Sequence, residues 1–166
     1  MPLPQGPENE YRPAAGIVLF NKKGQVWLGK RSGKQIDYAW QFPQGGLDKG
    51  ESAEFGALRE LREETGISID TLRPLARIEE QLFYDFPPEY AGRGRMKKWR
   101  GQRQFWFAYR FVGKKSDVNL KFHKPPEFTK WRWGDLHDAP ELVVPFKRKV
   151  YERVVTEFEG FADPKK

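Results

Sequence analysis

The sequence predicts an α/β fold in which a mixed β-sheet lies between helices, an α/β/α sandwich. Two observations lead to this prediction: short apolar and aromatic runs bounded by turn residues are typical of strands, and two longer segments carry apolar residues at helical spacing. Strands interleaved with helices along a chain favour a sheet covered by helices. At 166 residues the chain is long enough to bury the core of one domain. We expect that domain at 11–160, between a flexible leader at 1–10 and a tail at 161–166.

The first predicted elements are strands. The apolar, β-branched run AAGIVLF at 14–20, the turn residues at 21–24 and the run QVWLGK at 25–30 together predict a β-hairpin. Residues 40–44 predict a further strand, which leads directly into a double glycine.

Two helices are predicted. The first runs from about Ala53 to Thr65, where Ser52 is suited to cap the N-terminus and Gly66 to end the helix. The second covers Pro145–Phe158, because proline suits a first helical turn and apolar residues recur there at every fourth position. These apolar residues are Phe146, Val150, Val154 and Phe158.

Between the helices the sequence predicts three more strands and a long loop. The strands are expected at 75–82, 103–112 and 128–133, and the loop at 85–103, which is rich in proline and glycine. Apolar side chains occupy both faces of the segment 103–112. This pattern is typical of a central strand that is covered on both sides.

The composition excludes several classes of function. The chain has no cysteine, which excludes disulfides, a thiolate nucleophile and cysteine-ligated zinc. It has no apolar run of membrane length, and its N-terminus lacks the charged and apolar regions of a secretory signal. We therefore expect a cytoplasmic protein with no membrane partner.

Charge is distributed unevenly along the chain. Residues 45–70 contain seven acids and three bases, so this segment carries −4 and the remainder +11, within a total of +7. A basic body attracts polyanions, and a cation held by the acidic segment would also attract phosphate. Nucleotide or nucleic acid is therefore the expected partner.

The most informative segment is GGLDKGESAEFGALRELREETGI at 45–67. On the predicted helix, Glu60, Glu63 and Glu64 fall within an arc of about 100°, because residues three and four apart are neighbours. Carboxylates this close repel one another and predict a bound cation, and glutamate oxygens suit magnesium or manganese. Arg59 precedes Glu63 by four residues and can hold its carboxylate in place.

A simpler alternative is a solvent-exposed amphipathic helix, whose surface ion pairs contribute roughly a few tenths of a kcal/mol each. That alternative explains neither the position of Arg59 nor the glycines Gly45 and Gly46, which allow the backbone to approach a metal or a phosphate closely. We therefore favour the metal site.

The same segment resembles the Nudix box. Gly45, Glu51, the run 59–61, the pair 63–64 and the pair 66–67 match every position that the box specifies. Outside the box, the chain is similar to the bacterial RNA pyrophosphohydrolases and their relatives, the dinucleoside polyphosphate hydrolases. The segments that carry this similarity are YRPAAGIVLFN, WQFPQGG, RGQRQFWFAYRF, PEFTKWRW and VPFKRKVYERV.

The resemblance implies a Nudix-type α/β/α sandwich and a magnesium-dependent hydrolase with two or three Mg²⁺ or Mn²⁺ ions, which neutralise phosphate oxygens and activate water. Its expected reaction removes pyrophosphate from the 5′-triphosphate end of RNA, which leaves a 5′-monophosphate and initiates mRNA decay. The enzymatic alternative is asymmetric hydrolysis of diadenosine polyphosphates of the Ap4A type. A regulatory RNA-binding module that has lost the chemistry is a third reading, against which the intact set of glutamates argues. The oligomeric state is not predicted.

The resemblance also implies site residues. The backbone carbonyl of Gly45 is expected to contribute to the metal site, and Glu127 is a further ligand or the base. Glu64 and Glu127 remain alternatives for the residue that accepts the proton. The residues implied in metal binding or catalysis are Arg59, Glu60, Glu63, Glu64 and Glu127.

For the substrate, Arg12 and Arg31 resemble residues that contact phosphate and stack on the terminal base. Phe146 and Lys147 resemble the opposite side of that base clamp, although Phe146 also begins the apolar stripe of the last helix and could belong to the core. The remaining residues expected near the phosphates are Tyr84 and Gln102.

The segment RGRMKKWRGQR at 93–103 is a candidate track for a single nucleic-acid strand, because it combines bases with an aromatic residue and contains no acid. A merely solvated loop is the alternative. Its bases and aromatic residue are Arg93, Arg95, Lys97, Lys98, Trp99, Arg100 and Arg103.

Overall fold

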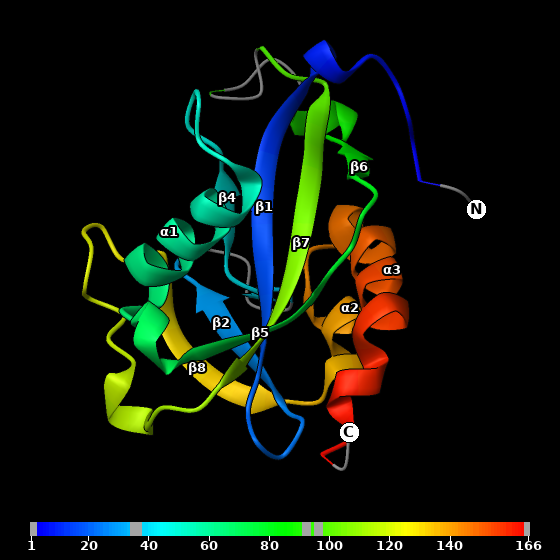
Figure 1. Ribbon diagram of the computed structural model, residues 1–166. Coiled ribbons are helices and arrows are strands. Elements are labelled where there is room, and N and C mark those ends of the chain that lie inside the picture. Colours follow the sequence, from blue (N-terminus) through cyan, green and yellow to red (C-terminus); the bar gives the residue numbers. More distant parts are fainter. Residues whose placement is uncertain (1–2, 34–37, 91–93, 95–97, 165–166) are drawn as a thin grey trace.

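A mixed β-sheet forms the middle layer of the computed structural model (Figure 1), which describes residues 3–33, 38–90, 94 and 98–164 and contains eight strands within them. Its two long central strands, β1 (Tyr11–Phe20) and β7 (Gly101–Phe111), run parallel to each other. The other described strand pairs are antiparallel, so the sheet is mixed, as predicted.

The shorter strands extend the sheet on both sides of this pair. The strands β2 (Val26–Arg31) and β4 (Gln44–Gly46) pair with β1, and β2 also pairs with β3 (Trp40–Gln41) and β8 (Phe128–Gly134). On the other side, β5 (Leu72–Arg77) and β6 (Leu82–Asp85) pair with β7.

Helices cover both faces of the sheet (Figure 1). On one face, α1 (Ala53–Thr65) packs against β1, and its Ala57 and Leu61 join a core that includes Trp27 and Phe107. On the other face, α2 (Ala139–Leu142) and α3 (Arg148–Phe158) cover a core around Trp106. The predicted α/β/α sandwich is confirmed. Among the described residues, no helix has the length and apolar character needed to cross a membrane.

Short 3-10 turns connect these elements. They lie at Glu8–Glu10, Ile69–Thr71, Pro88–Tyr90, Lys115–Asp117, Leu136–Asp138, Pro145–Lys147 and Glu159–Ala162.

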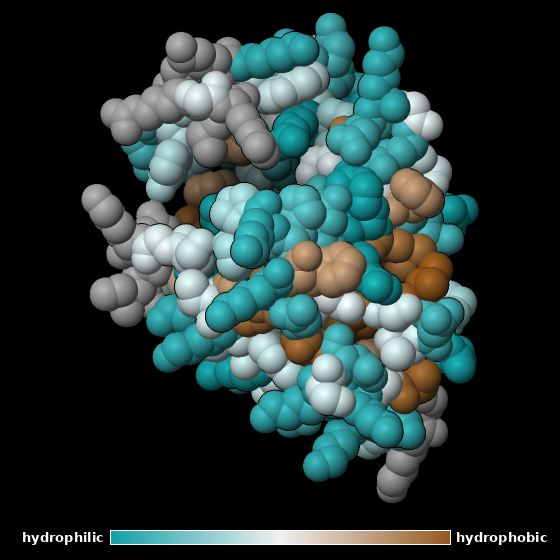
Figure 2. Space-filling model, turned by 90° about the vertical axis from the view of Figure 1, so that its left-hand side faces the viewer, coloured by the Kyte–Doolittle hydropathy of each residue, from teal (hydrophilic) through white to brown (hydrophobic). Residues whose placement is uncertain are grey.

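The predicted bounds of α1 are confirmed, and its caps explain them. The Ser52 side chain accepts a hydrogen bond from the backbone N–H of Phe55 at 3.2 Å, and Gly66 ends the helix in the left-handed conformation. The outer surface on the α1 side of the molecule is mostly hydrophilic (Figure 2), as expected for an amphipathic helix that turns one face to the sheet.

Two predicted strands are each divided in the structure. The strand expected at 40–44 is interrupted at Pro43, which has no N–H to donate, and the chain changes partners from β2 to β1. The strand expected at 75–82 ends at Arg77, because the exposed Glu79 and Glu80 form a bend before the chain returns to β7.

Other boundaries also differ from the prediction. The long loop is shorter than expected, because β7 already begins at Gly101, where it pairs with the end of β6. The last helix begins as a 3-10 turn at Pro145–Lys147 and becomes α-helical only at Arg148. Of its predicted apolar stripe, Val150, Val154 and Phe158 are buried, whereas Phe146 lies in the 3-10 turn and is only partly buried.

Candidate active site

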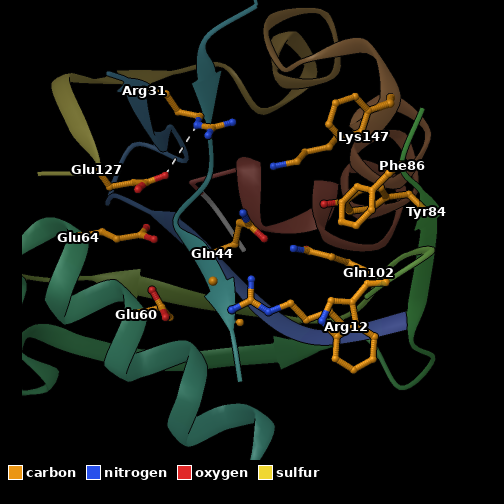
Figure 3. A pocket seen from close by; sticks show the side chains of 14 residues that line it. Arg12, Arg31, Gln44, Glu60, Glu64, Tyr84, Phe86, Gln102, Glu127 and Lys147 are labelled. Atoms are coloured by element: carbon orange, nitrogen blue, oxygen red, sulfur yellow. Dashed lines mark ion pairs between the residues drawn. The ribbon is translucent and has the colours of Figure 1, made fainter. Parts of the chain in front are cut away.

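A cavity of about 270 Å³ opens beside α1 and β4, and most of the predicted site residues line it (Figure 3). Acidic side chains lie along one side of the cavity, and cations, amides and aromatic rings lie along the other. A polyanion would therefore meet repulsion on one wall and attraction on the other, unless cations lie along the acidic wall.

The acidic wall consists of Glu60 and Glu64 from α1 and of Glu127, which directly precedes β8. Glu64 is only 7% exposed, and its Oε2 has no hydrogen-bond partner among the described residues. Burial, and then the negative charges of Glu60 and Glu127, raise the pKa of Glu64 well above its usual range. Burial also raises the pKa of Glu60, against the lowering effect of nearby Arg59.

Gly45 brings the main chain of β4 against this wall. A Cβ atom at Gly45 would collide with the carboxylate of Glu60, so any other residue would displace that side chain. Only glycine leaves room at this position for both the main chain of β4 and the carboxylate of Glu60.

Arg59 ties α1 to the turn before it. Its guanidinium donates to both carboxylate oxygens of Glu51, at 2.7 and 3.0 Å, and to the backbone carbonyl of Gly46 at 3.1 Å. It also donates to Glu60 at 3.1 Å and to Glu63 at 3.3 Å, which confirms the predicted contact with Glu63. The hydrogen bonds from Arg59 lower the pKa of Glu51, and those carboxylates raise the pKa of Arg59.

Glu63 does not line the cavity, because it lies against Arg59. Within the described part of the chain, no three acidic or histidine side chains lie close enough together to hold a metal ion. The residues nevertheless fit a hard cation: Glu64 Oε2 is buried and unpartnered, Gly45 brings its backbone to the wall, and the available donors are oxygens.

The opposite wall carries the cations Arg12 and Lys147 and the amides of Gln44 and Gln102, whereas Arg31 lies beside Glu127, between the two walls. Arg31 forms an ion pair with Glu127 at 3.7 Å. The guanidinium of Arg12 lies over the backbone of Gly46.

Lys147 is the most buried of these cations, at 6% exposure. No carboxylate of the described residues lies within ion-pair distance of its Nζ. Burial, followed by repulsion from Arg31, lowers the pKa of Lys147 to about 8.

Aromatic rings complete this wall. Phe146 lies 5.6 Å from the ring of Tyr84 and 5.6 Å from that of Tyr90, and it also packs against the core on the α3 side. Phe146 therefore lines the cavity and also contacts the core, so the clamp and the core stay the two predicted roles. Phe86 also lines the cavity and is not among the residues that the sequence predicts for the site.

The basic segment is described only in part. Arg93, Arg95 and Lys97 lie outside the described residues, whereas Trp99 lines the cavity and Lys98 Nζ lies 5.0 Å from the centre of its ring. The other two bases of the segment are paired. Arg100 donates to Asp85 and Glu10, and Arg103 donates to Gln81.

Comparison with known proteins identifies relatives of this chain. The family model of the NUDIX domain matches residues 10–154. The RNA pyrophosphohydrolase of Caulobacter vibrioides is 53% identical over 154 residues, which cover 92% of this chain and 88% of the relative. The RNA pyrophosphohydrolase of Rhodopseudomonas palustris is 48% identical over 160 residues, which cover 92% and 94%.

Solved structures share the fold at lower identity. The E. coli dihydroneopterin triphosphate pyrophosphohydrolase has a TM-score of 0.68 at 19% identity, with 89% of this chain and 98% of that chain covered. A C. elegans Ap4A hydrolase, solved as a binary complex, has a TM-score of 0.63 at 22% identity, with 90% and 98% covered. Because the family model spans most of the chain and the relatives are about half identical over nearly all of it, this protein belongs to the NUDIX family.

Proposed function

We propose that this protein removes pyrophosphate from the 5′-triphosphate end of RNA and leaves a 5′-monophosphate, the step that initiates decay of the transcript. The observation that carries the proposal is the two-sided cavity, with glutamates on one wall and cations, amides and aromatic rings on the other. The names of the relatives at 45–53% identity, RNA pyrophosphohydrolases, support RNA as the substrate.

The acidic wall is the proposed metal site. Glu60, Glu64, Glu127 and the backbone carbonyl of Gly45 would hold two or three Mg²⁺ or Mn²⁺ ions, and Glu63 belongs to the proposed set through its place on α1. When bound, these ions supply charge neutralisation at the phosphates and an activated water. Arg59 holds Glu60 and Glu63 by hydrogen bonds and thereby limits the positions that their carboxylates adopt.

The cationic wall is the proposed phosphate site. Arg12 and Lys147 bring two positive charges to this side of the cavity, where the amide of Gln102 adds a polar group, and Arg31 adds a third positive charge beside Glu127. Charged donors that the fold already holds in place stabilise a polyphosphate without being ordered on binding. The lysine suits an anion in particular, because its buried charge has no carboxylate partner among the described residues.

The aromatic wall is the proposed site of the first base. Phe146 is partly exposed and its ring contacts that of Tyr84, which Figure 3 shows on the side of the cavity away from the glutamates. Stacking of a base on an aromatic ring contributes about 1–3 kcal/mol. Such stacking discriminates weakly between bases, so the proposal predicts activity on transcripts with different first nucleotides.

Two carboxylates are candidates for the proton acceptor, Glu64 and Glu127. Both line the cavity, and each lies on a different element, α1 and the segment before β8. Single substitutions to glutamine separate them, because loss of the base changes the pH profile of kcat, whereas loss of a ligand changes the dependence on Mg²⁺ concentration.

Hydrolysis of 5′-triphosphorylated RNA in ¹⁸O-labelled water tests the proposal. We expect RNA with a 5′-monophosphate, release of pyrophosphate, dependence on Mg²⁺ and strongly reduced turnover by Glu64→Gln. The label identifies the phosphorus that is attacked. Intact RNA beside rapid cleavage of diadenosine tetraphosphate by the same preparation would overturn the RNA assignment in favour of a dinucleotide hydrolase.

A further inference from the structure

A buried chain of side-chain hydrogen bonds runs from the core to the cationic wall. The indole Nε1 of Trp106 donates to Oε1 of Gln104 at 3.0 Å. Nε2 of Gln104 in turn donates to Oε1 of Gln102 at 2.9 Å and to Oε1 of Gln44 at 3.1 Å. Gln104 is 2% exposed and does not line the cavity, whereas Gln44 and Gln102 do.

The chemistry of the first residue fixes the direction of every bond in this chain. An indole nitrogen can only donate, so Gln104 must turn its carbonyl oxygen toward Trp106. The amide nitrogen of Gln104 then points the other way and must meet acceptors, which are the oxygens of Gln44 and Gln102. Within the described residues, neither of these two amides uses its NH₂ group in a side-chain hydrogen bond, so both groups can turn into the cavity, and Figure 3 shows the nitrogen of Gln102 directed there.

The fold holds Trp106, the first donor of this hydrogen-bond chain, in place. Trp106 is fully buried, and its ring lies across β1 at Gly16, where a Cβ atom would come within 2.5 Å of the indole. Gly16 is the neighbour of Trp106 on β7 and of Gln44 on β4, so β1 brings the two partner strands to a common point. Gln102, Gln104 and Trp106 alternate along β7 and therefore share one face of the sheet.

We propose that Gln104 is a positioning residue that makes Gln44 and Gln102 present amide N–H groups, rather than carbonyl oxygens, to the phosphate oxygens of a bound polyphosphate. That the bound ligand is a polyphosphate rests on the proposed function. If the amide of Gln104 were flipped, Gln44 and Gln102 would both direct their carbonyl oxygens into the cavity. Because the cavity is already lined by glutamates, these oxygens would add to the repulsion of an anion. The arrangement instead adds neutral donors beside Arg12 and Lys147.

The first test replaces Gln104 with methionine, which has a similar length but neither donates nor accepts strongly. The probe is inorganic tripolyphosphate with Mg²⁺, measured by calorimetry. We expect affinity to fall about 10-fold, because two hydrogen bonds to a charged ligand lose their fixed donors. In turnover of triphosphorylated RNA, KM should rise more than kcat falls. The control Gln25→Met replaces an exposed glutamine outside the network and should leave affinity unchanged.

A mutant cycle separates positioning from a general structural effect. In a Gln44→Met/Gln102→Met background, Gln104→Met should cause no further loss of affinity, because the groups that it orients are gone. An equal loss in both backgrounds, or an unchanged affinity of the single variant, would overturn the proposal.

Gln104→Glu provides a second variant if the methionine variant does not fold. Glutamate still accepts from Trp106, but it can only accept from Gln44 and Gln102, so both amides must turn their oxygens into the cavity. We expect a larger loss of affinity in the wild-type background than in the double-methionine background, where only the added charge acts. Equal losses would refute the inversion of the amides.

Failure of the proposed function gives a different result. A protein that binds tripolyphosphate with the expected dependence on Gln104 but leaves triphosphorylated RNA intact supports the positioning role and overturns the RNA activity.

Discussion

Replacement of Lys147 with methionine should stabilise the protein and weaken its binding of polyphosphate. Lys147 is 6% exposed, and burial lowers its pKa from 10.5 to about 8. Each pKa unit corresponds to about 1.4 kcal/mol, so the charged side chain destabilises the folded state by about 3 kcal/mol at pH 7. Methionine keeps the unbranched stem and removes the charge. For a chain of this size, that gain corresponds to a rise in Tm of about 6–12 °C.

The pH dependence follows from the direction of the shift. The pKa of Lys147 is lower in the folded than in the unfolded chain, so the unfolded chain binds more protons between about pH 8 and 10.5. Below pH 8 the residue is charged in both states and the destabilisation is complete. As the pH rises from 8 to 10.5, the folded protein loses the proton first and the destabilisation disappears.

Urea unfolding at pH 7, 9 and 10.5 measures this effect. The stability difference between Lys147→Met and the wild type should be about 3 kcal/mol at pH 7 and close to zero at pH 10.5. The control Lys149→Met removes an exposed lysine two residues further on and should change stability by less than about 0.5 kcal/mol at any pH. A variant that is no more stable than the wild type at pH 7, or a difference that is independent of pH, would refute the reasoning.

Three further substitutions and one metal experiment test the site. Glu64→Gln should keep the fold and reduce turnover of triphosphorylated RNA more than about 100-fold, since it removes an ionised oxygen donor; near-normal kcat contradicts its assigned role. Phe146→Ala should raise KM more than it lowers kcat, whereas an unchanged KM with a lower Tm would assign the ring to the core. Gly45→Ala should weaken Mg²⁺ binding measured by calorimetry at least about 10-fold, because its Cβ displaces the Glu60 carboxylate, while Gly160→Ala, which has open space around it, should not. Chelation with EDTA should abolish turnover and added Mg²⁺ restore it; persistent activity would exclude the proposed metal site.

The sequence predicted α1 well because local interactions determine that helix. Its first residue follows a serine that caps it, and its last precedes a glycine in the left-handed conformation. Both signals lie within a few residues of the ends that they define, and the glutamates at helical spacing follow from the same periodicity.

Strand boundaries depend on partners that a single sequence does not show. The division at Pro43 separates one strand that pairs with β2 from another that pairs with β1, and the bend at Glu79 separates two strands that pair with β7. In both cases local composition favours an extended chain throughout. Only the choice of neighbour decides where the hydrogen-bonded ladder stops.

The candidate site shows the same limit. Helical periodicity alone predicts that Glu60 and Glu64 share one wall. Glu127 and Lys147 are predicted only by the family resemblance, because they lie in segments far from that helix in the sequence. Gln104 was missed although a signal exists. It alternates with Trp106 along β7 and therefore lies on the same face, which predicts a buried amide. Buried amides normally have defined hydrogen-bond partners.

Arg59 links the stability of α1 to the chemistry of the acidic wall. Its guanidinium forms ion pairs with Glu51, Glu60 and Glu63 and donates to the carbonyl of Gly46, so one positive charge is shared among three carboxylates. Glu64 is the exception, because it has no cationic partner among the described residues and is the most buried of the four. Glu64 is therefore the carboxylate at which a bound cation would gain the most, since a buried carboxylate without a partner costs more than one that is paired.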